Sequence, residues 1–316
     1  MGRKRVEVAV LRGFTDGAAG GNPAGMVLDA ERLSEAEKQA VAKEVGLSET
    51  AFLSPSATAT FRFDFFTPTR RIAHCGHATI AAFATLAADG LLPEGPISKE
   101  TIDGDRAIKM DGERAFMEQQ APDFVGAIGE LGVSDRDLAT ALGLSRLPPS
   151  DHSPTVVSTG NRFLLVPAPD EAAVLAARPD RALLTAISER LDLIGVYLFS
   201  PETRVAGRDA GARMFAPRYG IDEESATGMA AGPLGAFLVA RMGRGGRVLS
   251  IEQGQLMTPP SPSLLEVRLE TRGDAIGSVL VGGRGARERT VTVSIESAPP
   301  APPSSRAAGA PPCTPS

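Results

Sequence analysis

Two segments of this chain are apolar around their whole circumference, and they constrain the fold more than any other feature. Residues 75–90 read CGHATIAAFATLAADG, and residues 226–243 read ATGMAAGPLGAFLVARMG. Both open with Gly next to small polar residues, are rich in Ala and stop at Gly, as helices do. Because a helix without a polar face must be buried on all sides, each segment predicts a helix enclosed by the rest of the fold.

Short strand patterns bounded by Gly, Pro or Asp flank both segments. The simplest packing is a helix threaded through a curled β-sheet, formed twice. The two helices start about 150 residues apart, which favours two related halves. The predicted fold class is therefore α+β, with two pseudo-symmetric halves that each wrap a curled sheet or barrel around a central buried helix. Pro233 is expected either to kink the second helix or to delay its regular part.

Domain boundaries follow from length and composition. A chain of 316 residues suggests about two domains. The predicted first half spans residues 1–118, and the second spans 119–284. Residues 297–316 are rich in Pro, Ala and Ser without bulky apolar side chains, so we expect a disordered tail that contains Cys313.

Surface helices are expected as well. The clearest covers residues 35–45, where Ser34 is the N-cap, Glu37 completes a capping box and Gly46 is the stop. Two more are expected near 135–142 and 181–191.

Charge and composition exclude several classes of protein. The net charge is −5 and no basic stripe stands out, so we expect no nucleic-acid partner. No apolar run approaches the ~18–20 residues of a membrane span, so we expect no membrane partner. The first residues alternate as Val6, Val8 and Val10, which indicates a strand and not a signal peptide. Cys75 and Cys313 have different contexts and support no disulfide framework, so a reducing, cytoplasmic location is expected.

The starts of the two buried helices are the expected place for chemistry. The first N–H groups of a helix lack intrahelical partners, and the helix dipole adds positive charge there. Gly76 and Gly228 remove side-chain bulk at these ends, so two starts facing one cleft would bind a carboxylate or stabilise an enolate-like charge without a metal. The alternative is that both glycines only permit tight packing against strands.

Two histidines lie at the start of the first helix. We expect the positive helix end to keep His77 neutral, so that its imidazole donates one hydrogen bond and accepts another; it could also be only a capping residue. His74 lies three residues earlier and is expected to be structural or exposed. The spacing resembles a metal-ligand pair, but His152 is the only other histidine and no further cluster supports it, so no metal is expected.

Cys75 and Glu49 are the other candidates. A helix N-terminus lowers a thiol pKa, so Cys75 could be a thiolate base or simply a small buried residue. The matching position of the second helix is Thr227, which excludes catalysis by two thiols. Glu49 lies beside Phe52 and Leu53, where desolvation should raise its pKa toward the working pH of a general acid or base; capping or solvation is the alternative.

Five motifs occur in a fixed order and together carry a resemblance. They resemble the phenazine-biosynthesis PhzF-like family, with its YddE-like proteins, of the diaminopimelate-epimerase-like superfamily, over about residues 5–296. The motifs are GNPAG at 21–25, VGLSETAFL at 45–53, FDFFTPTRRIAHCGHATIAAF at 63–83, STGNRFLLV at 158–166 and ARMFAPRYGIDEESATGMAAGPLGAFL at 212–238.

The resemblance implies a site in the cleft between two similar halves. It implies that a late strand near 285–296 returns to the first half, that no cofactor is used and that the protein is a homodimer. Glu49 would be the proton-shuttling carboxylate, with His77 and Glu224 as further catalytic residues. The implied substrate-binding residues are Asn22, Cys75, Gly76, Thr227, Gly228 and Met229.

Two positions depart from the family pattern. Glu224 stands where the family usually has Asp, and Met229 stands where it commonly has Ser. Met229 removes a hydroxyl donor worth roughly 1–3 kcal/mol if charge-assisted. The departures leave the reaction type intact and put the substrate of the phenazine isomerase in doubt.

The leading hypothesis is a cofactor-independent isomerase or epimerase in which Glu49 moves a proton on a small carboxylate-bearing substrate. One alternative is a non-catalytic protein that binds a small organic acid on the same scaffold. Another is an epimerase or dehydratase in which Cys75 and Glu49 act as opposing acid and base.

Overall fold

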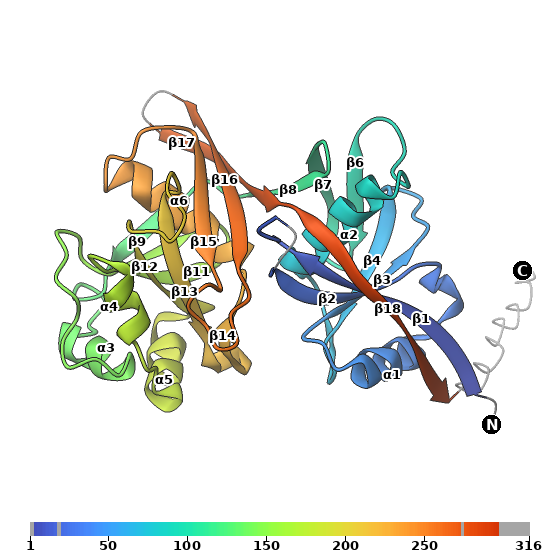
Figure 1. Ribbon diagram of the computed structural model, residues 1–316, viewed down its shortest axis with the longest axis horizontal. Coiled ribbons are helices and arrows are strands. Elements are labelled where there is room, and N and C mark those ends of the chain that lie inside the picture. The colour runs from blue at the N-terminus through green and yellow to red at the C-terminus, as the bar shows by residue number, and fades with distance from the viewer. Residues whose placement is uncertain (1–2, 18–19, 273–274, 297–316) are drawn as a thin grey trace, which may run out of the picture.

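The computed structural model describes residues 3–17, 20–272 and 275–296. The molecule consists of two halves that lie side by side, each with a curled sheet around one central helix (Figure 1). The central helices are α2 (Gly76–Ala88) and α6 (Gly228–Ala240). This arrangement confirms the predicted α+β fold of two similar halves, each built around a buried helix.

The two sheets have the same strand pairing. In the first, the order is β18-β1-β2-β3-β4-β6-β7-β8, and neighbours pair antiparallel except for β2–β3 and β4–β6, which are parallel. In the second, the order is β9-β10-β11-β12-β13-β15-β16-β17, and the parallel pairs β11–β12 and β13–β15 stand at the same places. The short strands β5 and β14 pair with β4 and β13 in the same way. The halves therefore repeat one topology.

The strands of the first half are β1 (Arg3–Gly13), β2 (Asn22–Val27), β3 (Thr50–Ser54), β4 (Phe61–Phe66), β5 (Arg71–Ile72), β6 (Ile97–Thr101), β7 (Gly104–Asp111), β8 (Arg114–Gln119) and β18 (Gly285–Glu296). Those of the second are β9 (Asp123–Ala127), β10 (Thr155–Ser158), β11 (Arg162–Pro167), β12 (Gly195–Ser200), β13 (Ala210–Ala216), β14 (Ile221–Glu224), β15 (Val248–Gln253), β16 (Ser263–Arg272) and β17 (Ala275–Gly283).

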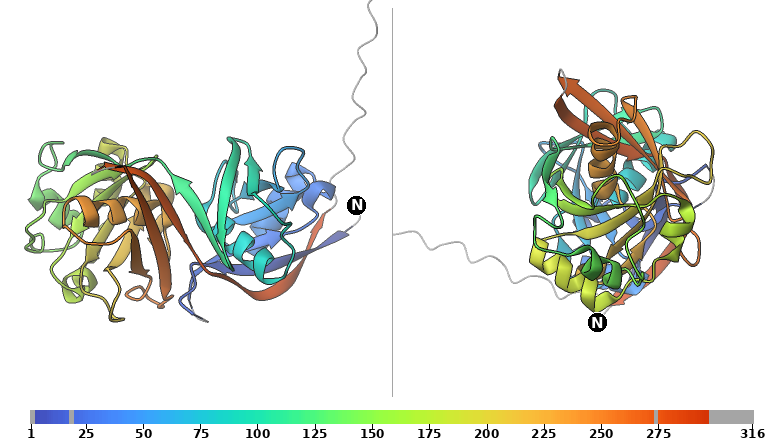
Figure 2. Two further views of the ribbon diagram at one scale, coloured as in Figure 1. Left: turned by 90° about the horizontal axis from the view of Figure 1, so that it is seen from above. Right: turned by 90° about the vertical axis from the view of Figure 1, so that its left-hand side faces the viewer.

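One long ribbon connects the two halves. β17 belongs to the second sheet and pairs with β8 of the first, and β18 follows at once and pairs with β1 (Figure 2). Side chains also form contacts between the halves. The guanidinium of Arg208, in the second half, donates hydrogen bonds of 2.8 and 2.9 Å to the carboxylate of Asp16, in the first half.

Each sheet has an inner and an outer apolar face, because strand side chains alternate. On β12, Tyr197 and Phe199 face the core around the central helices, whereas Val196 and Leu198 face the outer helices. The outer helices of the second half are α3 (Asp135–Ala141), α4 (Glu171–Ala176) and α5 (Arg181–Leu191), and that of the first is α1 (Glu35–Val45). Short 3-10 turns lie at η1 (Ala30–Arg32) and η2 (Pro217–Tyr219).

The structure tests the helix boundaries that the sequence predicts. α1 has the Ser34–Glu37 capping box and ends at Gly46, as expected. Pro233 lies within α6, which continues through it from Gly228 to Ala240, so the regular part is not delayed. No described helix combines the length and the apolar character that crossing a bilayer requires. The tail predicted for 297–316 lies outside the described residues.

Candidate active site

The central helices differ from the outer ones at their starts. The outer α-helices each have a capping side chain, from Ser34, Ser134, Asp170 and Asp180. The starts of α2 and α6 have no side-chain cap, although Cys75 and Thr227 occupy the N-cap positions. The first N–H groups of both helices are therefore left for another acceptor, and the helix dipoles favour an anionic one.

The glycines at these two starts differ in their reason for being there. A Cβ added at Gly76 would meet nothing within 4 Å, so packing does not require glycine. A Cβ at Gly228 would lie 3.0 Å from Cζ of Phe14, so close packing does restrict that position. The packing explanation therefore holds for Gly228 and fails for Gly76, where the missing side chain leaves open space beside the helix start.

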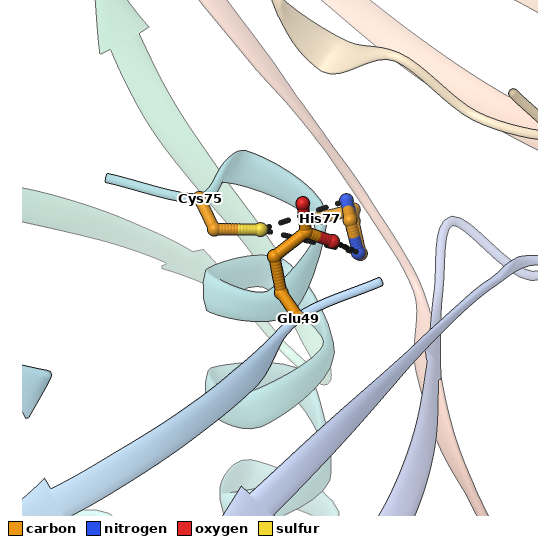
Figure 3. A group of neighbouring side chains, drawn as sticks. All are labelled: Glu49, Cys75 and His77. Carbon is orange, nitrogen blue, oxygen red and sulfur yellow. Dashed lines mark hydrogen bonds and ion pairs between the residues drawn. The ribbon is translucent and has the colours of Figure 1, made fainter. Parts of the chain in front are cut away.

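Three predicted residues point toward one another at the start of α2 (Figure 3). Cys75 and His77 come from the beginning of the helix, and Glu49 immediately precedes β3. Nε2 of His77 lies 3.3 Å from Oε2 of Glu49. The sulfur of Cys75 lies 3.6 Å from Nδ1 of His77. Oε2 of Glu49 is buried and makes no well-formed hydrogen bond to the described residues. This carboxylate oxygen could therefore accept a proton from a bound ligand.

Glu224 brings the second half to the same point. Its Oε1 lies 3.6 Å from Nδ1 of His77 and accepts a 2.8 Å hydrogen bond from the amide of Asn22. Its Oε2 accepts a 2.5 Å hydrogen bond from the hydroxyl of Thr227, the N-cap of α6. The starts of both central helices therefore converge on one cluster, with His77 between the two carboxyl groups.

A polar network behind Thr227 holds the start of α6. Oε1 of Gln253 accepts hydrogen bonds from the backbone N–H of Thr227 at 3.0 Å and from the hydroxyl of Tyr197 at 2.8 Å. Nε2 of Gln253 donates to the carbonyl of Glu224 at 2.7 Å. These buried bonds fix the position of the helix start and of the Glu224 backbone.

Two electrostatic predictions are corrected. Burial alone raises the pKa of Glu49, but hydrogen bonding and the positive charge of His77 outweigh it, so the pKa of Glu49 is lowered and not raised. Burial alone lowers the pKa of His77, but the sulfur of Cys75 and the carboxylate of Glu49 outweigh it, so the pKa of His77 lies well above 6.5. The direction of this shift favours the imidazolium, and not the neutral imidazole that the helix dipole predicted.

The pKa values of the other two groups of the cluster, Glu224 and Cys75, are both raised. Burial raises the pKa of Glu224, although His77 and Thr227 oppose the shift. Burial also raises the pKa of the Cys75 thiol. The two carboxyl groups thus have pKa values pushed apart, which is the usual sign of one base and one acid in a site.

A metal ion could in principle use Glu49, Cys75 and His77, whose ligand atoms lie within 4.8 Å of one another. Metal ligation needs a thiolate and a neutral imidazole. The raised pKa values of Cys75 and His77 act against both forms. A metal bound there would have to displace a proton from each of these two groups.

A cavity of about 500 Å³ opens between the halves, next to the residues that begin the two central helices; Glu49, Cys75, His77 and Glu224 are not among its lining residues. His74 lines it just before the start of α2, and Met229 lines it from the first turn of α6. The other lining residues are Ala73, Asp103, Arg106, Met117, Glu118, Gln119, Gln120, Thr159, Gly160 and Asn161.

The structure brings the predicted site residues together. Asn22, Glu49, Cys75, His77, Glu224 and Thr227 form the cluster, Gly76 and Gly228 lie at the helix starts, and Met229 faces the cavity. Gln253, Tyr197 and Lys99 were not predicted. Gln253 is the last residue of β15, and its sequence context carries no signal for this role.

Comparison with known proteins agrees with this arrangement. A profile described as phenazine biosynthesis-like protein matches residues 11–290. The uncharacterized isomerase YddE of Escherichia coli is 32% identical over 85% of this chain and 92% of that protein. The trans-2,3-dihydro-3-hydroxyanthranilate isomerase of Pseudomonas chlororaphis is 32% identical over 87% of this chain and 95% of its own. The crystal structure of a PhzF-family phenazine biosynthesis protein from Bacillus anthracis superposes with a TM-score of 0.82, at 26% identity, over 92% of this chain and all of that one.

Proposed function

Because this chain belongs to the phenazine biosynthesis-like family, we propose that it is a cofactor-independent isomerase or epimerase that moves a proton on a small carboxylate-bearing substrate. The observation that carries the proposal is the meeting of two uncapped helix starts around Glu49, His77 and Glu224. Such a site binds an anion and holds acid and base groups at the same point.

The proposed reaction begins at Glu49. Its buried Oε2 removes a proton from a carbon next to an unsaturated or carboxylate-bearing group, and the C–H electron pair moves onto that group. The N–H groups at the starts of α2 and α6, together with the cation of His77, stabilise the resulting negative charge. Glu49, now protonated, returns the proton to the same or another carbon, which forms a new C–H bond and restores the carboxylate.

Glu224 has a different proposed role. Its raised pKa and its hydrogen bonds to Asn22 and Thr227 favour a carboxyl group that keeps its proton and orients the substrate or His77. Glu49 has the lowered pKa, and its Oε2 makes no well-formed hydrogen bond beyond the 3.3 Å ion pair with His77, which favours Glu49 as the base. The assignment of base and acid follows from the opposite directions of these two shifts.

The substrate class is a small organic acid. The relative from Pseudomonas chlororaphis is named for trans-2,3-dihydro-3-hydroxyanthranilate, a cyclic acid with an oxygen substituent. Glu224 and Met229 depart from the family pattern at the second helix start, so we propose that this protein acts on a different acid of similar size.

Solvent hydrogen exchange tests the function. We expect substrate-dependent incorporation of deuterium from D₂O into a carbon position, and a loss of about 10²–10⁴-fold in the Glu49→Gln variant. Glu44→Gln, which changes an exposed residue of α1, is the matched control and should exchange normally. Undiminished exchange by Glu49→Gln would remove Glu49 from the role of base.

The burial and raised pKa of Cys75 favour Glu49 over a thiolate as the base. A non-catalytic organic-acid-binding protein is a second candidate, because Met229 replaces a hydroxyl donor at the start of α6. That candidate predicts binding of 3-hydroxyanthranilate, an aromatic analogue of the relative's substrate, with no exchange for any organic acid tested.

A further inference from the structure

Lys99 is a fully buried lysine that the proposed reaction does not use. It lies on β6, where Ile97, Lys99 and Thr101 alternate inward with more exposed neighbours. Its exposed fraction is 0%, and no described acidic side chain forms an ion pair with it. A buried amine without a carboxylate is costly for a fold to keep, so its contacts call for an explanation.

The amine of Lys99 has two polar partners. Nζ donates a 2.7 Å hydrogen bond to Oγ1 of Thr79, whose hydroxyl in turn donates to the carbonyl of Cys75. Nζ also lies 3.1 Å from Nδ1 of His74 and 5.1 Å from the centre of the Phe65 ring. One N–H of Lys99 is thus used on Thr79, and the direction of the hydrogen bond between Nζ and Nδ1 of His74 depends on the tautomer of the imidazole.

Charge in this region favours the neutral forms. Burial lowers the pKa of Lys99 to about 7; the positive Arg106 adds to the shift, and Cys75 opposes it. Burial, Lys99 and Arg106 lower the pKa of His74 to about 3. His74 is therefore a neutral imidazole with a single N–H, and its tautomer depends on the group that faces Nδ1.

The other nitrogen of His74 is free. If Nδ1 accepts from Lys99, the hydrogen of the imidazole is on Nε2. Nε2 has no hydrogen-bond partner among the described residues, and it is not one of their buried unpartnered atoms. His74 is one of the residues that line the 500 Å³ cavity, which Met229 of α6 lines as well.

We propose that Lys99 is a positioning residue of this site: it holds His74 in the tautomer with hydrogen on Nε2, and this N–H binds an oxygen acceptor of the substrate in the cavity. The inference rests on the proposed function and deepens it. It assigns the ligand a second polar group, an oxygen substituent separate from the part that Glu49, His77 and Glu224 act on.

The first experiment reads the tautomer directly. The chain has three histidines, so ¹⁵N-histidine labelling gives a resolvable spectrum, and a His152→Gln variant identifies one signal. We expect His74 to be neutral with its hydrogen on Nε2 between about pH 5 and 9, and to lose this fixed tautomer in Lys99→Met. A hydrogen on Nδ1, or a His74 that titrates near 6.5 in the wild type, overturns the proposal.

The second experiment measures binding of three probes. 3-Hydroxyanthranilate carries a carboxylate and a hydroxyl, anthranilate lacks the hydroxyl, and 2-aminophenol lacks the carboxylate. We expect Lys99→Met and His74→Phe to weaken 3-hydroxyanthranilate binding by about three- to tenfold. For the probe that lacks the oxygen bound by His74, the two variants should bind with wild-type affinity. His74→Gln, which keeps an N–H donor at similar reach, should restore part of the affinity.

Structural damage gives a different result. It would weaken all three probes equally and lower the Tm of Lys99→Met, whereas we expect that Tm to stay level or rise. Equal penalties, wild-type affinity in His74→Phe, or no binding of any probe to the wild type would each overturn the inference. Loss of exchange in Glu49→Gln together with a wild-type response in the Lys99 and His74 variants would leave the proposed function standing and remove only this inference.

Discussion

The side-chain amide of Asn22, on β2 in the first half, donates a 2.8 Å hydrogen bond to Oε1 of Glu224 on β14 in the second half. The same amide donates to the carbonyl of Ala226 at 3.0 Å. One buried amide of the first sheet thus binds both the acidic group and the backbone that leads into the second central helix. The position of the cleft residues depends on contacts that cross between the halves.

Asn22→Ala is expected to lower the free energy of unfolding by about 1–3 kcal/mol, because it leaves two buried acceptors without their donor. It should also raise the pKa of Glu224 further, since the Asn22 hydrogen bond opposes the shift. Urea unfolding measures the first effect. Asn161→Ala, which removes an exposed amide, is the control and should stay within about 0.5 kcal/mol of the wild type.

Gly76→Ala is expected to separate stability from binding. The new Cβ meets no atom within 4 Å, so stability should be unchanged or higher by up to about 1 kcal/mol. The methyl group nevertheless fills the space beside the start of α2, so binding of 3-hydroxyanthranilate should weaken. In Gly228→Ala the Cβ lies 3.0 Å from Phe14, and that variant should lose stability. Unchanged affinity in Gly76→Ala would mean that the ligand does not approach this helix start.

Met229→Ser restores a hydroxyl to the first turn of α6. If the carboxylate of the ligand lies there, we expect affinity for 3-hydroxyanthranilate to rise by up to about tenfold, the effect of one charge-assisted hydrogen bond. Calorimetric titration measures the change, and 2-aminophenol, which has no carboxylate, should gain nothing. An equal gain for both probes would place the new hydroxyl near a different part of the ligand.

The pH dependence of hydrogen exchange follows from the shifted pKa values of Glu49 and His77, which form an ion pair. The pKa of Glu49 is lowered from 4.5, so the base should stay ionised through the weakly acidic range, and the acidic decline in kcat/KM should lie below pH 4.5. The pKa of His77 is raised well above 6.5, so stabilisation by its cation should persist to a higher pH than an ordinary histidine would allow. His77→Gln removes the cation and should move the acidic decline to higher pH. An unmoved decline would show that His77 does not set the pKa of Glu49.

Lys99→Met should change the pH dependence of stability. The unfolded lysine holds its proton up to about pH 10.5, whereas the folded one releases it near pH 7. Between these values the unfolded chain binds more protons, so wild-type stability should rise with pH across this window by roughly 3–5 kcal/mol.

The Lys99→Met variant should therefore be more stable than the wild type at pH 6, with an advantage that shrinks toward pH 10. Urea unfolding across this range measures the difference. Lys109→Met, which removes an exposed lysine from the neighbouring strand, is the control for the loss of a lysine as such. A pH-independent difference for Lys99→Met would mean that the folded lysine keeps its ordinary pKa.

The parts of the fold that could be predicted depend on local chemistry. The α1 capping box needs only Ser34 and Glu37, three residues apart, and it forms as expected. The two central helices could be predicted because their sequences lack a polar face. β2 was not predicted, because Pro23 and Gly25 disfavour a strand, and it forms because β1 and β3 pair with it on both sides.

The electrostatics of the site could not be read from neighbours in sequence. The expectation for Glu49 rested on burial beside Phe52 and Leu53. Burial does raise its pKa, but His77, which only the fold brings within 3.3 Å, outweighs burial and lowers it. Lys99 did leave a weak signal, because it holds an inward place between Ile97 and Thr101 in a strand pattern. A lysine at an inward position of an alternating strand indicates a buried polar contact.

The pairing of β18 with β1 also bears on the order in which the molecule forms during synthesis. Residues 285–296 leave the ribosome after the whole second half, so until then β1 has an open edge that other chains could pair with. Vectorial folding can complete the second half before the first. A newly made chain should therefore be most prone to aggregation, and most in need of a chaperone, just before this last strand emerges.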